Sequence, residues 1–258
     1  MGFSKRVLSS LLGWMIPSGI FITPVQAEIV MFTLHTDIQT EDTITAKTYI
    51  TTDRMRVELR KEGRDITSIF HLDEKVFWMI ENKDSTYQEI TEKDLQEIKE
   101  KIEQLEERMN KLPNAVRRII EGVTGGKVRA AKIPYTYAKK ASGVKVKNWK
   151  CDHYEGTFEG IKVEEVWSAY WKDLGFTRGD FQVLEDLGEF FNLGAFTEEY
   201  DKFYRLEAKE GEYTGIPIRR VHYLNGVIQS ITELIEIERK NLPSTLFDIP
   251  EGLVKKNR

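Results

Sequence analysis

Cysteine is nearly absent from the sequence, and this limits how the fold can be held together. Cys151 is the single cysteine among 258 residues, so no internal disulfide can form. The fold must therefore depend on burial of apolar side chains. A lone thiol is usually buried and inert, and we expect Cys151 to be a core residue and not an intermolecular crosslink.

Long runs of basic residues or of apolar residues are scarce as well. No basic tract occurs, which argues against nucleic acid as a partner. Outside the N-terminus, no apolar run approaches the roughly 20 residues that a membrane-spanning helix needs.

The N-terminus has the three parts of a secretory signal. Lys5 and Arg6 precede an apolar run from Val7 to Ile22, and the small residues of Val25-Gln26-Ala27 suit signal peptidase. Pro17 interrupts the run, which is too short for a retained anchor. We therefore expect residues 1–27 to be cleaved, leaving a chain that does not span the membrane. Because this segment holds two basic and no acidic residues, its removal takes the net charge from −4 to −6.

Residues 29–90 predict short β-strands joined by polar turns. Met55, Val57 and Leu59 alternate with charged residues, which is typical of a strand with one face in the core. Val76–Ile80 is apolar on both faces. The short turns favour an antiparallel meander.

A helix is predicted over residues 91–112. Thr91 suits the N-cap, and Asp94 can close a capping box with it. Ile90 and Leu95 stand where a hydrophobic staple would form. Apolar residues then recur at steps of three and four, and we expect this stripe to pack against the sheet.

The remaining chain returns to β structure and then repeats the alternation. Strands are expected at 133–138, 144–154 and 163–170, with a turn at Ala141-Ser142-Gly143, followed by a Phe-rich helical block at 180–207. Asn225-Gly226 between two β runs predicts a closing hairpin. The fold class expected is α+β: one large curved antiparallel sheet, an open half-barrel, with helices packed on its concave face. Residues 28–258 would form a single domain.

No motif for catalysis, a metal or a cofactor is found. The four histidines, His35, His71, His153 and His222, lie far apart, and no HExxH or paired metal-ligand spacing occurs. Cys151 and His153 would share a strand face, where they could hold a metal or form a thiolate beside a base. A buried thiol beside a partly exposed imidazole is the simpler interpretation, since no third ligand is identifiable.

Adjacent carboxylates also offer no catalytic pair. Glu164 and Glu165 would point to opposite faces of a strand and cannot work together as general acid and base. Charge runs of this kind usually lie on solvated faces, and we expect these two to do so.

Aromatic residues are more abundant than a sheet with one wet face needs. They either fill the core or leave an apolar cavity beside it, and composition does not separate these alternatives. If a cavity exists, the residues expected to line it are Trp78, Phe190, Phe191 and Phe196.

Several segments together resemble a known family. They include Thr45–Ile50, Arg54–Glu58, Val76–Ile80, Trp149–Tyr154 and Leu246–Pro250. The succession resembles an uncharacterised family of exported bacterial proteins thought to share the curved half-barrel of periplasmic lipoprotein carriers (LolA-like). The resemblance implies a periplasmic location and the sheltering of lipid chains or partner proteins. It offers no catalytic residues.

Three functions follow as hypotheses. The first is a non-enzymatic periplasmic binding protein for a lipid or acyl ligand, or for a lipidated partner, without a cofactor. The second is an envelope interaction or sensor module with no small ligand, which would use sheet edges or the acidic helix face at Glu97–Glu107. The third is a hydrolase whose groups meet only in the folded chain.

Overall fold

The computed structural model describes residues 28–61, 63–110, 135–192 and 211–256. The predicted signal peptide and Phe196 lie outside these residues, and so does most of the predicted helical block at 180–207.

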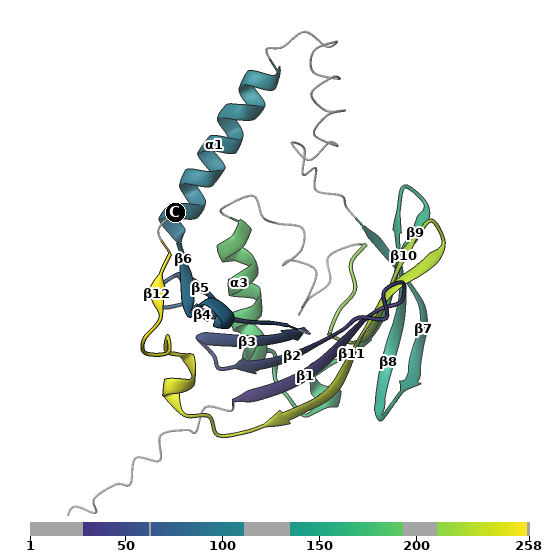
Figure 1. Ribbon diagram of the computed structural model, residues 1–258. Helices are drawn as coiled ribbons and strands as arrows, with labels where there is room; N and C mark the ends of the chain where they lie inside the picture. Colours follow the sequence, from purple (N-terminus) through teal and green to yellow (C-terminus); the bar gives the residue numbers. More distant parts are fainter. Residues whose placement is uncertain (1–27, 62, 111–134, 193–210, 257–258) are drawn as a thin grey trace, which may run out of the picture.

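Twelve strands form one continuous open sheet, ordered β12-β6-β5-β4-β3-β2-β1-β11-β10-β9-β8-β7 (Figure 1). The strands are β1 (Ile29–Asp37), β2 (Thr43–Ile50), β3 (Arg54–Lys61), β4 (Arg64–His71), β5 (Val76–Glu81), β6 (Thr86–Thr91), β7 (Thr136–Val146), β8 (Trp149–Phe158), β9 (Ile161–Ala169), β10 (Ile216–Leu224), β11 (Val227–Arg239) and β12 (Val254–Lys255). The described helices are α1 (Glu92–Asn110) and α3 (Gln182–Asn192), with short 3-10 turns η1 (Asn82–Asp84), η2 (Trp171–Leu174), η3 (Arg178–Phe181) and η4 (Ser244–Phe247).

The antiparallel meander predicted for residues 29–90 is confirmed. Strands β1 to β6 lie side by side in chain order, each antiparallel to the next. The second half joins through β1 and β11, which pair antiparallel. Only β12 runs parallel to its neighbour β6 among the described strands.

The expected α+β class, with helices covering a concave face, is wrong. The sheet dominates the fold, and α1 projects away from it (Figure 1). Leu95 in the first turn of α1 is fully buried, whereas Ile98 one turn later is only half-buried. An apolar stripe shows that a helix has a face to bury, but not which surface covers it. The other described α-helix, α3, packs against the sheet through Phe190 and Phe191.

The start of α1 follows its sequence signals. The Thr91 N–H donates to Asp94 Oδ2 at 2.8 Å, and the Asp94 N–H donates to Thr91 Oγ1 at 3.3 Å. This is the predicted capping box. It fixes the helix at the end of β6, near the edge of the sheet, and the helix axis then leads outward.

Each face of β3–β5 buries a different apolar cluster. On one face, Phe70 and Phe77 pair across β4 and β5 and pack against α3. On the other, Trp78 and Ile80 join Phe247 of η4, with the C-terminal segment around it as cover. The segment Val76–Ile80, apolar on both sides in sequence, is therefore covered on both sides.

Of two turns predicted from glycine-containing segments, the structure contains one. Asn225 and Gly226 have φ of 52° and 77° and connect β10 to β11, as expected. The turn expected at Ala141–Gly143 does not exist, because β7 continues through it with register shifts. Gly143 takes a φ of 71° inside the strand, which is a bulge position and not a hairpin end.

Candidate functional site

Of the four residues expected to line a cavity, the structure brings two together. Phe190 and Phe191 of α3 pack with ring centroids 5.2 Å apart. Phe190 lies 5.3 Å from Phe70, and Phe191 lies 5.0 Å from Phe77. Trp78 follows Phe77 in β5 and therefore points to the opposite face, in the other cluster. The structure does not bring Trp78 together with the phenylalanines of α3.

A pocket of about 230 Å³ opens beside Phe190. Its apolar lining comes from Phe70, Leu72 and Phe190, contributed by β4, the β4–β5 turn and α3. Its polar lining comes from Lys75, Glu92, Asp186 and Glu189. The pocket thus combines an apolar floor with a charged rim.

The rim carries more negative than positive charge. Lys75 Nζ lies 3.0 Å from Glu92 Oε2, so these two charges balance each other. Asp186 accepts a hydrogen bond from Gln182 Nε2 at 3.3 Å, and Glu189 is exposed. The two carboxylates on α3 have no further cation in the pocket lining to offset them. The rim therefore favours a neutral or positively charged group over an anion.

Half-buried apolar side chains lie on the same face of the sheet as Phe70. Val57, Met79 and Ile90 pack against the cluster that contains Phe70 and Phe190, yet none of the three is fully buried.

A second group of polar residues surrounds Glu164, which has no solvent exposure at all. Arg220 donates to Glu164 Oε1 from Nε at 2.9 Å and from Nη2 at 2.7 Å. The Tyr137 hydroxyl donates to Oε2, and His222 Nε2 lies 3.2 Å from Oε1. Burial, with the Glu164 charge beside it, holds the pKa of Tyr137 far above its usual value, so the phenol stays protonated.

The expectation that Glu164 lies on a solvated face is wrong. Alternation along Val163–Val166 places Glu164 on the side of the fully buried Val166, and that alternation was the available sequence signal. Sequence reasoning could not supply Arg220, which lies 56 residues away. Glu164 is completely enclosed, and its ion pair with Arg220 lies inside the protein.

Glu165 forms a similar group on the opposite side of β9, as the two-residue period requires. It accepts from the Tyr223 hydroxyl, and its carboxylate lies 3.0 Å from Lys162 Nζ and 3.2 Å from His153 Nε2. Burial alone would raise the pKa of Glu165, but the hydrogen bonds from Tyr223 and Lys162 outweigh it and lower that pKa.

His153 is therefore engaged by Glu165, and its ring also stacks on Trp167 with centroids 4.5 Å apart. Cys151 is 1% exposed, and burial raises the pKa of its thiol to about 11. This environment disfavours the thiolate that a nucleophile or a metal ligand would need. It matches the expectation of an inert core thiol.

Comparison with known families matches one segment, in the second half of the chain. A family described as Domain of unknown function (DUF4412) matches residues 135–253. The matched segment holds α3 and the groups around Glu164 and Glu165, but it leaves out β1–β6 and α1. The chain is thus similar to a family of unknown function over this range, and a lipoprotein-carrier half-barrel is not confirmed.

Two solved structures show distant likeness. One is an uncharacterised conserved protein from Thermus thermophilus, with 11% identity and a TM-score of 0.47, covering 91% of this chain and 92% of that one. The other is a DUF1329 family protein from Desulfovibrio piger, with 8% identity and a TM-score of 0.29, covering 88% and 91%. Both scores are too low to decide the fold or the role. None of the curated proteins compared with the chain matches it.

In the part of the chain that the structure describes, no helix has the length and apolar character needed to cross a membrane.

Proposed function

We propose that the protein is a non-enzymatic binding protein that shelters an apolar group, from a lipid or acyl ligand or from a lipidated partner, in the pocket beside Phe190. The observation on which this rests is the position of the pocket. It is lined by two buried phenyl rings, and the half-buried side chains of Val57, Met79 and Ile90 pack against the cluster to which those rings belong.

The size of the pocket limits what it can take. Sites for drug-sized ligands span roughly 300–1,000 Å³, and an apolar cavity of about 150 Å³ is enough for benzene. At about 230 Å³, the pocket suits one end of a chain and not a whole lipid. Burying about six methylenes at about 0.8 kcal/mol each contributes roughly 5 kcal/mol. This gain sets an upper limit on the affinity, a dissociation constant of about 0.2 mM, because the freedom that the ligand loses on binding opposes it.

The charged rim then selects the head of the ligand. Lys75 is paired with Glu92, so the remaining charge at the rim is the negative charge of Asp186 and Glu189. An ammonium group held near these carboxylates gains on the order of 1 kcal/mol, and a carboxylate loses a similar amount. The preferred ligand therefore has an apolar tail and a cationic or neutral head.

Three probes with one tail test this directly: octylamine, octanol and octanoate, titrated by NMR. We expect affinity to fall in that order, with at least fivefold between the amine and the acid. Glu189→Lys should erase the difference, while Glu236→Lys, at an exposed residue of β11 away from the pocket, should leave it unchanged. Equal affinities for all three probes would contradict the assignment of the rim.

Filling the pocket tests the location. Leu72→Trp places a larger side chain in the pocket lining and should weaken octylamine binding at least tenfold. Ile161→Trp adds the same ring at a position 61% exposed in β9 and should have no effect. Native mass spectrometry of protein purified without detergent then looks for a natural ligand, whose absence in every preparation would count against this function.

We also propose that the protein works in the periplasm after cleavage behind Ala27. A chain beginning at Glu28 keeps the contact in which the Lys240 N–H donates to the Glu28 carbonyl at 3.0 Å. Cell fractionation with mass analysis of the N-terminus tests this. Protein retained in the cytoplasm with residues 1–27 intact would refute it.

A second candidate function is an envelope interaction module without a small ligand. Large apolar side chains are exposed in the β8–β9 and β10–β11 hairpins, including Ile161, Leu224 and Val227, each at least 60% exposed. A photo-crosslinker at Leu224 should then capture one defined envelope protein, whereas the same group at the exposed Lys172 should not. Crosslinking at neither position would reject this alternative.

A further inference from the structure

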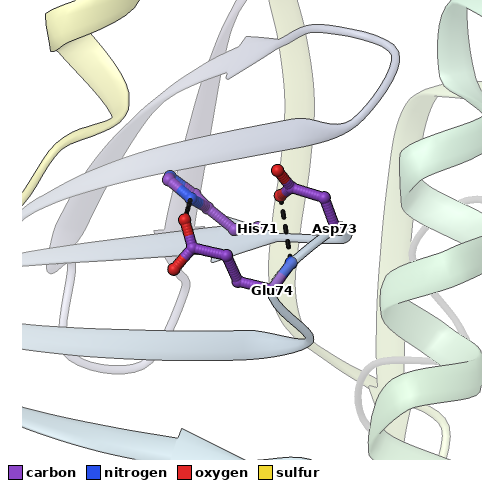
Figure 2. A group of neighbouring side chains, drawn as sticks. All are labelled: His71, Asp73 and Glu74. Atoms are coloured by element: carbon purple, nitrogen blue, oxygen red, sulfur yellow. Dashed lines mark hydrogen bonds and ion pairs between the residues drawn. The ribbon is translucent and has the colours of Figure 1, made fainter.

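The turn between β4 and β5 brings three metal-ligating side chains together. One atom each from His71, Asp73 and Glu74 lies within 4.8 Å of the others (Figure 2). The turn is fixed at both sides, because the Leu72 N–H donates to the Asp53 carbonyl at 2.9 Å and the Lys75 N–H donates to the Leu72 carbonyl at 3.2 Å. No HExxH or similar spacing announces this group in the sequence.

His71 is the informative member, because its side chain is only 4% exposed. Its Nε2 lies 2.9 Å from the carbonyl oxygen of Phe247. A carbonyl can only accept, so Nε2 must carry the hydrogen. In the neutral imidazole, Nδ1 then has a free lone pair, and that lone pair faces Glu74 Oε1 at 3.2 Å.

A hydrogen bond forms at this distance when a proton lies between Nδ1 and the carboxylate, and a metal ion can take the place of that proton. Among the described residues, the hydrogen-bond partners of the His71 ring are both acceptors, Glu74 Oε1 and the Phe247 carbonyl oxygen. Asp73 adds a second carboxylate, and the nearest cation to it is Arg54, whose Nη2 lies 3.9 Å from Asp73 Oδ2. The group therefore combines a buried nitrogen lone pair with two carboxylates and little compensating charge.

We propose that His71 Nδ1 and the carboxylates of Asp73 and Glu74 bind a divalent transition-metal ion, with Zn²⁺ as the best match. One imidazole and two carboxylates suit zinc better than Mg²⁺ or Ca²⁺, which prefer oxygen ligands alone. Zinc lies about 2.0–2.2 Å from such ligands, so any two of them can be at most about 4.4 Å apart. Asp73 and Glu74 are 53% and 56% exposed and can rotate to close the remaining gap.

The Phe247 carbonyl would not bind the metal, but it accepts the hydrogen bond from the other ring nitrogen of His71. A metal-bound histidine almost always donates its other ring N–H to a carbonyl or carboxylate, which fixes the ring. Here that carbonyl belongs to η4, which Arg56 also holds by donating from Nη1 to the Leu246 carbonyl at 3.0 Å. A bound ion would thus fasten the C-terminal segment over Trp78 and its cluster.

Isothermal titration of the purified full-length protein with Zn²⁺ tests the proposal. We expect one ion per chain, and the double variant Asp73→Asn, Glu74→Gln should weaken binding at least tenfold. The matched double variant Glu41→Gln, Asp65→Asn removes two exposed carboxylates elsewhere and should bind as the parent does. Unchanged affinity in the first variant would overturn the proposal, because the zinc would then be bound at another place.

A spectroscopic readout separates metal binding from simple protonation of the ring. In ¹⁵N-edited NMR of the imidazoles, Zn²⁺ should shift Nδ1 of His71 while its Nε2 keeps the proton donated to Phe247. A His71 ring that already carries two protons and does not respond to Zn²⁺ would show that a proton fills the gap and would reject the metal site.

Discussion

Glu164 and Glu165 are adjacent residues with matching partners, and their substitution gives a sharp test of the buried charge pair. Each carboxylate contacts a tyrosine hydroxyl, a histidine and a cation. They differ in burial, since the side chain of Glu164 is 0% exposed and that of Glu165 is 16% exposed. Glu→Gln at each position keeps the shape and removes the charge.

Glu164→Gln leaves the Arg220 guanidinium, itself 5% exposed, without its counter-charge. Breaking a buried pair from one side costs about 3–5 kcal/mol. Glu165→Gln removes a carboxylate that solvent reaches, and pairs of that kind contribute up to about 1 kcal/mol. For a chain of this size, the first loss corresponds to a fall in Tm of roughly 10 °C and the second to a few degrees.

Urea denaturation followed by circular dichroism measures both losses. The double variant Glu164→Leu, Arg220→Met should be less destabilised than Glu164→Gln, because replacing a buried ion pair with apolar groups is often nearly neutral. Equal losses for Glu164→Gln and Glu165→Gln, or a loss below about 1 kcal/mol for the former, would refute the reasoning from burial.

Four further predictions concern the helix cap Thr91, the glycine at 215, the thiol of Cys151 and the loss of stability at acidic pH. Thr91→Ala should destabilise the protein by about 1 kcal/mol in urea, because α1 loses its capping hydroxyl. Gly215→Ala should cost more, about 2 kcal/mol on the same scale, since φ is 97° and a Cβ would lie 2.5 Å from the Ala169 carbonyl oxygen. Cys151, with its pKa raised to about 11 by burial, should resist a thiol reagent at pH 8 until the protein unfolds, and fast native labelling would contradict this. The pKa of Glu165 is lowered from 4.5 in the folded state, so its contribution is complete above that pH and is lost as pH falls through the folded value. Glu165→Gln should therefore flatten the acid limb of a stability–pH curve, and an unchanged limb would count against the shift.

Local structure was largely predictable from the sequence. The alternation at Met55, Val57 and Leu59 identified β3, and Asn225-Gly226 located the last hairpin. These signals act between near neighbours, where steric and hydrogen-bonding preferences decide the outcome. The capping pair at the start of α1 belongs to the same class.

The arrangement of those elements was not predictable in the same way. The stripe on α1 gave no information on its partner, and only Leu95 of the first turns is fully buried. The Gly143 position resembled a turn because a bulge and a hairpin both use a glycine with positive φ. In each case a tertiary contact decided between two local alternatives.

The candidate sites depended even more on long-range contacts. Phe190 was expected beside an apolar cavity from composition alone, whereas the pocket beside it is formed with Phe70, far away in the chain. Trp78 was grouped with it by composition, although its place next to Phe77 in a strand puts it on the other face. The alternation of side chains along a strand is visible in the sequence, and it could have separated Trp78 from Phe190 before the structure was known.

The most direct test of the binding proposal is a set of intermolecular NOEs between the alkyl chain of octylamine and the rings of an isotope-labelled protein. The account predicts contacts to Phe70 and Phe190, with none to Trp78. Contacts confined to Trp78 or to the hairpin residue Leu224, or saturation without contacts to either phenylalanine, would contradict it.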